Sequence, residues 1–320
     1  MIYLIVLQKK HSSPDCSADR SSSYDDVLVS ISEVENAINE LKRNKSCGLD
    51  GIVSEHLKFA HRRLSVLLSI CFSSFLVHGV LPDKLMSVVL VPVIKDKSRK
   101  ISCIDNYRPI ALSSVLSKVL EIIIRNRILD LLSTQPNQFG FKKKVGTDQC
   151  KYVLKEIIDA YMMLNSSVFV CFLDASKAFD RVNHGTLFWK LVNRGVPYYI
   201  VRLLVYWYSN QTMCVRWGNA ISDVFKTSNG VRQGSVLSPF LFNVYVDSLS
   251  EILNQQHIGC FNSGELINHL LYADDLCLIS PSVNGLNISL SVFVKSLVLT
   301  MMLFIFQRKV LLNTSNQSSW

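Results

Sequence analysis

Three aspartates in this 320-residue chain lie where carboxylates are useful for phosphoryl transfer. Asp174 follows the apolar run VFVCFL, residues 168–173, while Asp274 and Asp275 separate two short apolar segments. A carboxylate at the end of a buried strand costs free energy unless a cation or a donor satisfies it. Three carboxylates from two strand ends can instead hold two Mg²⁺ ions roughly 3.5–4 Å apart, as in-line phosphoryl transfer requires.

Each of these signals is weak when taken alone. A polar β-turn explains the tripeptide Ala273-Asp274-Asp275, and an aspartate at the end of a strand is common. The spacing therefore leaves a metal site and an ordinary turn both open, and the surrounding sequence has to decide between them.

Apolar patterning predicts the elements that hold these aspartates. Residues 168–173 are expected to form a buried strand, and 269–280 a hairpin that turns at 273–275. A further strand is expected from Leu85, and strand-rich structure over 201–235. Helices are expected over 34–45, 57–78, 113–132, 152–164, 175–192 and 238–253, the last one capped by Ser238 with Pro239 at its first position.

Positive charge is concentrated in one part of the chain. The net charge is 34 − 25 = +9, and residues 84–155 alone contain 14 basic and 5 acidic residues, which is again +9. This distribution favours a polyanionic partner, although a solvated basic face also explains it.

Composition excludes several classes of protein. With 49% apolar and 18% charged residues, the chain has enough apolar material for a core and too little charge for general disorder. None of the nine cysteines lies in a CxxC pair, so we expect no zinc site and reduced thiols. We therefore expect an intracellular protein, without distinguishing nucleus from cytoplasm.

Six ordered blocks carry a resemblance to a known family over about residues 32–280. They resemble the reverse transcriptase domain of non-LTR (LINE-like) retrotransposons, and their order is much more specific than YADD alone. The blocks are NKSCGLDGI from Asn44, NYRPIALSSVLSKVLEIIIRNRI from Asn106, QFGFKKKVGTDQC from Gln138, FLDASKAFDRVNH from Phe172, GVRQGSVLSPFLFNVYVDSL from Gly230 and LLYADDLCLIS from Leu270.

The resemblance implies an α/β (α+β) fold of the right-hand polymerase type. We expect a palm with a small antiparallel sheet and helices on one face, helical fingers, and a thumb that is missing or truncated. The expected divisions are a leader at 1–31, a fingers-like region at 32–165, a palm at 166–287 and an aberrant apolar tail at 288–320.

The resemblance also implies an activity, RNA-directed DNA polymerisation. The partners would be an RNA template, a DNA primer and dNTPs, and the cofactor two Mg²⁺ ions, with Mn²⁺ as a substitute. No membrane partner is expected, and the oligomeric state is not indicated. A catalytically dead remnant that only binds nucleic acid, or an inert product of a decayed gene, are the alternatives.

Roles for individual residues follow from the same resemblance. Asp174, Asp274 and Asp275 would be the catalytic, metal-binding triad. Phe179 would be the steric gate against a ribonucleotide 2′-hydroxyl, with core packing as the alternative, and Gln233-Gly234 would contact the nucleotide and template unless they form an ordinary turn. Two further sets are expected to meet phosphates: Arg108 and Lys95 at the nucleotide, and Lys142, Lys143 and Lys144 along the nucleic-acid backbone.

The tail departs from the family pattern. Residues 288–306 contain a single charge, Lys295, and are long enough to span a membrane. We favour translation of a damaged reading frame over a poorly patterned buried helix or a membrane span. Without a thumb, we expect weak or absent polymerase activity.

Overall fold

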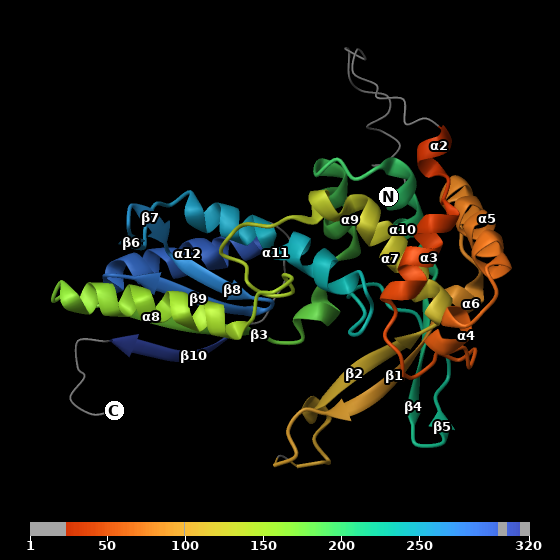
Figure 1. Cartoon of the computed structure of the whole chain (residues 1–320). Coiled ribbons are helices and arrows are strands. Elements are labelled where there is room, and N and C mark those ends of the chain that lie inside the picture. Colours follow the sequence, from red (N-terminus) through yellow and green to blue (C-terminus); the bar gives the residue numbers. More distant parts are fainter. Residues whose placement is uncertain (1–23, 99, 300–305, 314–320) are drawn as a thin grey trace.

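The computed structural model describes residues 24–98, 100–299 and 306–313, and its central feature is an antiparallel sheet that carries the three aspartates. The sheet order is β10-β3-β9-β8, and the register places Asp174 opposite Asp275 (Figure 1). The predicted strand and the predicted hairpin are both present. The strands are β3 (Phe169–Ala175), β8 (His269–Tyr272), β9 (Asp275–Ser280) and β10 (Phe306–Asn313).

Helices cover both faces of this palm sheet, so the expectation of helices on one face is wrong. α8 (Thr147–Met163) packs on one face, where Ile157 joins Val170 and Ile279 in one apolar cluster. α11 (Ser238–Asn254) and α12 (Val283–Leu299) cover the other face, with Cys171 and Leu173 (Figure 1). The physical reason is that VFVCFL is apolar at every position, which is typical of a strand buried on both sides.

A second sheet, of order β2-β1-β4-β5, forms the fingers. β1 pairs with β2 in antiparallel fashion and with β4 in parallel, although β4 comes more than 100 residues later. Fingers and palm thus interleave in the sequence: β4 and β5 lie in the fingers sheet, and α8 lies on the palm sheet. The bounds are β1 (Ser87–Ile94), β2 (Tyr107–Ser113), β4 (Thr212–Trp217) and β5 (Ala220–Ile221).

The region expected to be strand-rich begins as a helix instead. α10 (Tyr198–Asn210) follows α9 (His184–Asn193), and Leu203, Leu204 and Trp207 are fully buried in it. Aromatic and β-branched residues favour strands on average, but here burial on one helix face outweighs that preference.

The remaining helices form a bundle beside the fingers sheet, on the right of Figure 1. α7 starts immediately after β2 and packs against α3, which also contacts α5. The helices are α2 (Tyr24–Val27), α3 (Ile31–Glu40), α4 (Ser54–Lys58), α5 (Arg63–His78), α6 (Asp83–Met86) and α7 (Val115–Ile128). Elsewhere in the chain, the 3-10 turns are η1 (Ile104–Asn106), η2 (Leu129–Leu132) and η3 (Ala178–Arg181). A separate hairpin pairs β6 (Cys260–Asn262) with β7 (Glu265–Ile267).

The apolar tail begins as a packed helix. The boundary expected at residue 288 falls inside α12, whose Leu286 and Phe293 are buried against α11 and the palm sheet. This agrees with the buried-helix interpretation as far as residue 296. Residues 300–305 lie outside the described part, and 306–313 add strand β10 beside β3. No helix in the described residues is long and apolar enough to cross a membrane. A missing thumb stays a prediction.

Candidate active site

Asp174 and Asp275 form a cross-strand pair at one end of the palm sheet. They are register partners on the antiparallel strands β3 and β9. Directly opposed residues have their Cα atoms about 4.5–5.5 Å apart and project to the same face. Successive side chains of a strand point to opposite faces of the sheet. Because Leu173 and Ala175 pack in the core with α11, Asp174 between them lies on the α8 face. Asp275 lines a groove on that face beside Phe172 and Tyr272.

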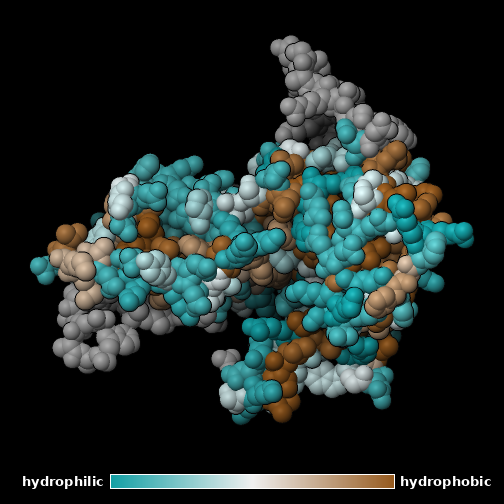
Figure 2. Space-filling view, in the orientation of Figure 1, coloured by the Kyte–Doolittle hydropathy of each residue, from teal (hydrophilic) through white to brown (hydrophobic). Residues whose placement is uncertain are grey.

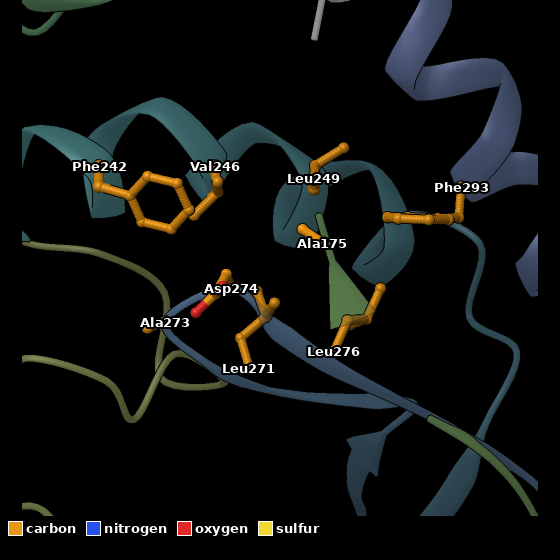
Figure 3. A pocket seen from close by; sticks show the side chains of 9 residues that line it. All are labelled: Ala175, Phe242, Val246, Leu249, Leu271, Ala273, Asp274, Leu276 and Phe293. Atoms are coloured by element: carbon orange, nitrogen blue, oxygen red, sulfur yellow. The ribbon is translucent and has the colours of Figure 1, made fainter. Parts of the chain in front are cut away.

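Asp274 lies in the turn beside this pair but on the other side of the hairpin. Its side chain lines a small pocket between the hairpin and helices α11 and α12, together with Phe242, Val246 and Phe293 (Figure 3). In the described residues, no three His, Cys, Asp or Glu side chains converge as a ready metal site. The structure thus brings two of the three predicted carboxylates together and leaves the third one residue away. Carboxylate oxygens are the ligands that Mg²⁺ prefers, so the donor chemistry fits a divalent cation.

Phe179 is half-buried between two other aromatic rings. It stacks on Phe242 of α11 with ring centroids 4.6 Å apart, and meets Phe141 edge-on at 5.9 Å. Phe242 also lines the pocket that holds Asp274. The ring is therefore fixed in position close to the hairpin of β8 and β9, and it satisfies the core-packing interpretation at the same time.

The loop that carries Gln233 and Gly234 is joined to the fingers sheet. The Gln233 carbonyl accepts a hydrogen bond of 2.7 Å from the Ala111 N–H of β2. Gly234 has a φ of +109°, and a Cβ there would lie 3.1 Å from the Ala111 carbonyl oxygen. Both the backbone conformation and the close approach favour glycine at this position.

A buried ion pair that the sequence analysis missed holds the same loop. Arg232 and Glu121 are 2.5 Å apart, and Glu121 also accepts from the Ser235 hydroxyl (2.7 Å) and the Val236 N–H (2.6 Å). These groups immediately precede α11, so Glu121 of α7 satisfies the start of that helix in place of the predicted cap Ser238. The available signal was a lone glutamate inside the apolar run VLEIII of α7.

Lys95 and Arg108 are exposed on the β1–β2 hairpin. Lys95 directly follows β1, and Arg108 lies within β2. The Lys95 ammonium donates to the Asp105 carbonyl at 3.1 Å. Asp105 in turn forms an ion pair of 3.0 Å with Lys177, which lies two residues after the end of the palm strand β3. The hairpin is thereby tied to the palm. Figure 2 shows its lower tip with teal and brown side chains mixed, where Ile101 and Ile104 are exposed.

The three successive lysines Lys142, Lys143 and Lys144 differ in their exposure and in their contacts. Lys143 and Lys144 are exposed. The Lys142 ammonium instead donates to the Gln135 carbonyl at 2.8 Å, and burial lowers its pKa while the charge of Asp247 opposes that shift. Lys143 and Lys144 are therefore better placed to meet a nucleic-acid backbone than Lys142.

Comparisons with known proteins agree with this geometry. Residues 94–304 match the family described as reverse transcriptase (RNA-dependent DNA polymerase). The matched range includes residues 288–304. The chain is 29% identical over 259 residues to the RNA-directed DNA polymerase from mobile element jockey of Drosophila funebris. It is 30% identical over 260 residues to the probable RNA-directed DNA polymerase from transposon BS of Drosophila melanogaster.

The solved structure of apo telomerase from Candida tropicalis, truncated from its C-terminal domain, shares the fold. The TM-score is 0.55 at 13% identity, and the alignment covers 99% of this chain and 83% of that one. The matches to jockey and BS cover 79% of this chain but only 28% of either relative's length. On the family match and the six ordered blocks, the chain belongs to the reverse transcriptase (RNA-dependent DNA polymerase) family, as a reverse transcriptase domain of the non-LTR, LINE-like retrotransposon type.

Proposed function

We propose that this chain extends a DNA 3′-hydroxyl with dNTPs copied from an RNA template. The observation that carries the proposal is the register pairing of Asp174 with Asp275, beside the turn that holds Asp274. Two carboxylates held opposite each other on paired strands, with a third in the adjacent turn, offer the oxygen donors that Mg²⁺ prefers.

Asp174 and Asp275 would hold divalent metal, two Mg²⁺ ions with Mn²⁺ as a substitute, and Asp274 would complete the set. When bound, such metals lower the pKa of an attacking hydroxyl and neutralise the leaving pyrophosphate. The contribution of the protein is to fix these carboxylates on paired strands, where their separation is set by the backbone ladder.

The other residues would select and orient the nucleotide. The Phe179 ring, held between Phe242 and Phe141, would leave no room for a 2′-hydroxyl. Gly234 would let the loop backbone approach the template and the base. Lys95 and Arg108 on the fingers hairpin would neutralise the triphosphate, and Lys143 and Lys144 would follow the nucleic-acid backbone.

A second candidate is a domain that binds nucleic acid without chemistry. It is favoured by the position of Asp274 on the α11 and α12 side of the hairpin, which leaves the three carboxylates without a common centre in the described residues. The concentration of positive charge in 84–155 serves either function.

Primer extension separates the two candidates. The full chain is given an RNA template, a DNA primer, dNTPs and Mg²⁺, and compared with Asp174→Asn, Asp274→Asn and Asp275→Asn. The matched control is Asp223→Asn, which changes an exposed carboxylate just after β5. We expect weak extension with wild type and Asp223→Asn, and its loss in the three variants with RNA binding by fluorescence anisotropy unchanged. RNA binding with no extension from any protein would favour the second candidate.

A further inference from the structure

A loop from the fingers side of the chain is bonded along the catalytic hairpin. In this loop, residues 137–141, the Phe139 N–H donates to the Leu271 carbonyl at 2.7 Å, and the Leu271 N–H donates to the Asn137 carbonyl at 2.8 Å. The Asn137 side chain also donates to the His269 carbonyl at 3.0 Å. The loop therefore follows β8 up to the turn that carries the aspartates.

At that turn, the side chain of Gln138 bonds the backbone of Ala273. Its Oε1 accepts from the Ala273 N–H at 3.0 Å and from the Gly140 N–H at 2.8 Å, and its Nε2 donates to the Ala273 carbonyl at 3.4 Å. Gln138 is only 1% exposed, so water does not replace these bonds. One buried amide thus satisfies both backbone groups of the residue that precedes Asp274.

Ala273 needs such support because its backbone is strained. Its φ is +57°, a region that favours glycine and that costs other residues about 1–3 kcal/mol. The loop also packs closely, since a Cβ at Gly140 would collide with the Ala273 nitrogen. The Gly140 carbonyl is held in turn by the Asn243 amide of α11 at 2.8 Å. Asn243 of α11 therefore supports the strained turn at Ala273 through a chain of hydrogen bonds that passes by Gly140 and Gln138.

We propose that Gln138 is a positioning residue that fixes the left-handed conformation of Ala273 and so sets the direction of Asp274 and Asp275. This assignment rests on the proposed function only where it concerns catalysis. Its structural content, a hydrogen bond that protects one backbone amide, is independent of any activity. Gln138 touches neither substrate nor metal ligand directly and acts through Ala273.

The test uses the full chain and three substitutions. Gln138→Met keeps the size of the side chain and removes the amide, whereas Gln138→Glu keeps an acceptor for the Ala273 N–H. The matched control is Gln211→Met, because Gln211 is also 1% exposed but lies between α10 and β4 in the fingers. Two quantities are measured: hydrogen exchange at the Ala273 amide by NMR, and primer extension as a function of Mg²⁺ concentration.

The proposal expects exchange at Ala273 to become at least about tenfold faster in Gln138→Met, the equivalent of one lost hydrogen bond, and to stay near the wild-type rate in Gln138→Glu and Gln211→Met. Extension by Gln138→Met should need more Mg²⁺, with RNA binding unchanged. Unchanged exchange at Ala273 in Gln138→Met would overturn the proposal whatever the activity. If wild type itself does not extend a primer, the polymerase proposal fails while the exchange result still decides the role of Gln138. If Gln138→Met unfolds, retained protection in Gln138→Glu supports the role, and lost protection contradicts it.

Discussion

The guanidinium of Arg232 and the carboxylate of Glu121 are 2.5 Å apart, and the two side chains are 1% and 0% exposed. The guanidinium also lies over the Trp207 ring, 4.8 Å from its centroid. Glu121 therefore joins the helical bundle to the loop that carries Gln233 and Gly234. The pair fixes the place of this loop beside β2, where the Gln233 carbonyl meets Ala111.

Removing one partner of this pair should destabilise the whole domain. In Glu121→Gln the Arg232 charge stays buried without its counter-charge, so we expect a loss of about 3–5 kcal/mol in the free energy of unfolding. Urea denaturation followed by circular dichroism measures it. The control Glu156→Gln, on an exposed position of α8, should stay within about 0.5 kcal/mol of wild type. Equal effects of the two substitutions would contradict the role given to the pair.

Replacing Asp174 by Asn should weaken metal binding and abolish extension. It removes one of the two carboxylates that face each other across β3 and β9. Added Mg²⁺ should raise the melting temperature of wild type, because a bound ligand stabilises the folded state, and should raise that of Asp174→Asn less. The same thermal shift in both proteins would show that Asp174 does not hold the metal.

The sugar selectivity of the proposed polymerase reaction should depend on Phe179. Phe179→Ala is expected to increase incorporation of ribonucleotides relative to dNTPs, measured in single-nucleotide extension with each substrate. Phe141→Ala is the comparison, since it removes the edge-on neighbour at 5.9 Å but keeps the Phe179 ring and its stack on Phe242 at 4.6 Å. A change in selectivity as large in Phe141→Ala as in Phe179→Ala would assign Phe179 to packing alone.

Acid should weaken the palm through His269. Burial lowers the pKa of His269 to about 4, from an ordinary value near 6.5. Between these two values the unfolded chain binds a proton that the folded chain does not, so stability falls as the pH falls, by about 1.4 kcal/mol per pH unit from this group. The difference in unfolding free energy between wild type and His269→Gln, followed from pH 7 to pH 4, should show this slope.

The bonds of the buried imidazole suit a neutral ring. Its Nδ1 lies 2.6 Å from Oδ1 of the Asn268 side chain and its Nε2 lies 2.7 Å from the Ser250 hydroxyl. A neutral ring satisfies both, and a second proton would displace the Ser250 hydrogen. His78→Gln, at an exposed position of α5, is the control and should leave the pH profile unchanged.

Much of the palm was predictable because its strands are short and apolar, and because charged residues mark where they end. The hairpin turn at Asp274 and the strand before Asp174 lie within two residues of the predicted positions. By contrast, local patterns carry no information on long-range pairing. The parallel contact of β1 with β4, and the bonds from Gln138 to Ala273, join segments more than 100 residues apart. The helix α10 was missed because its aromatic residues fit either kind of element until the packing partner is known.

The pairing of β1 with β4 also bears on how the chain is synthesised. Ser87 and Thr212, opposite each other at the start of this pairing, are 125 residues apart in sequence. At ribosomal rates of about 5–20 residues per second, one edge of β1 waits roughly 6–25 s for its partner. During that interval an apolar strand edge is open to other nascent chains, which is a known route to aggregation. The fingers sheet is therefore completed only after the segment that follows α10 has been synthesised.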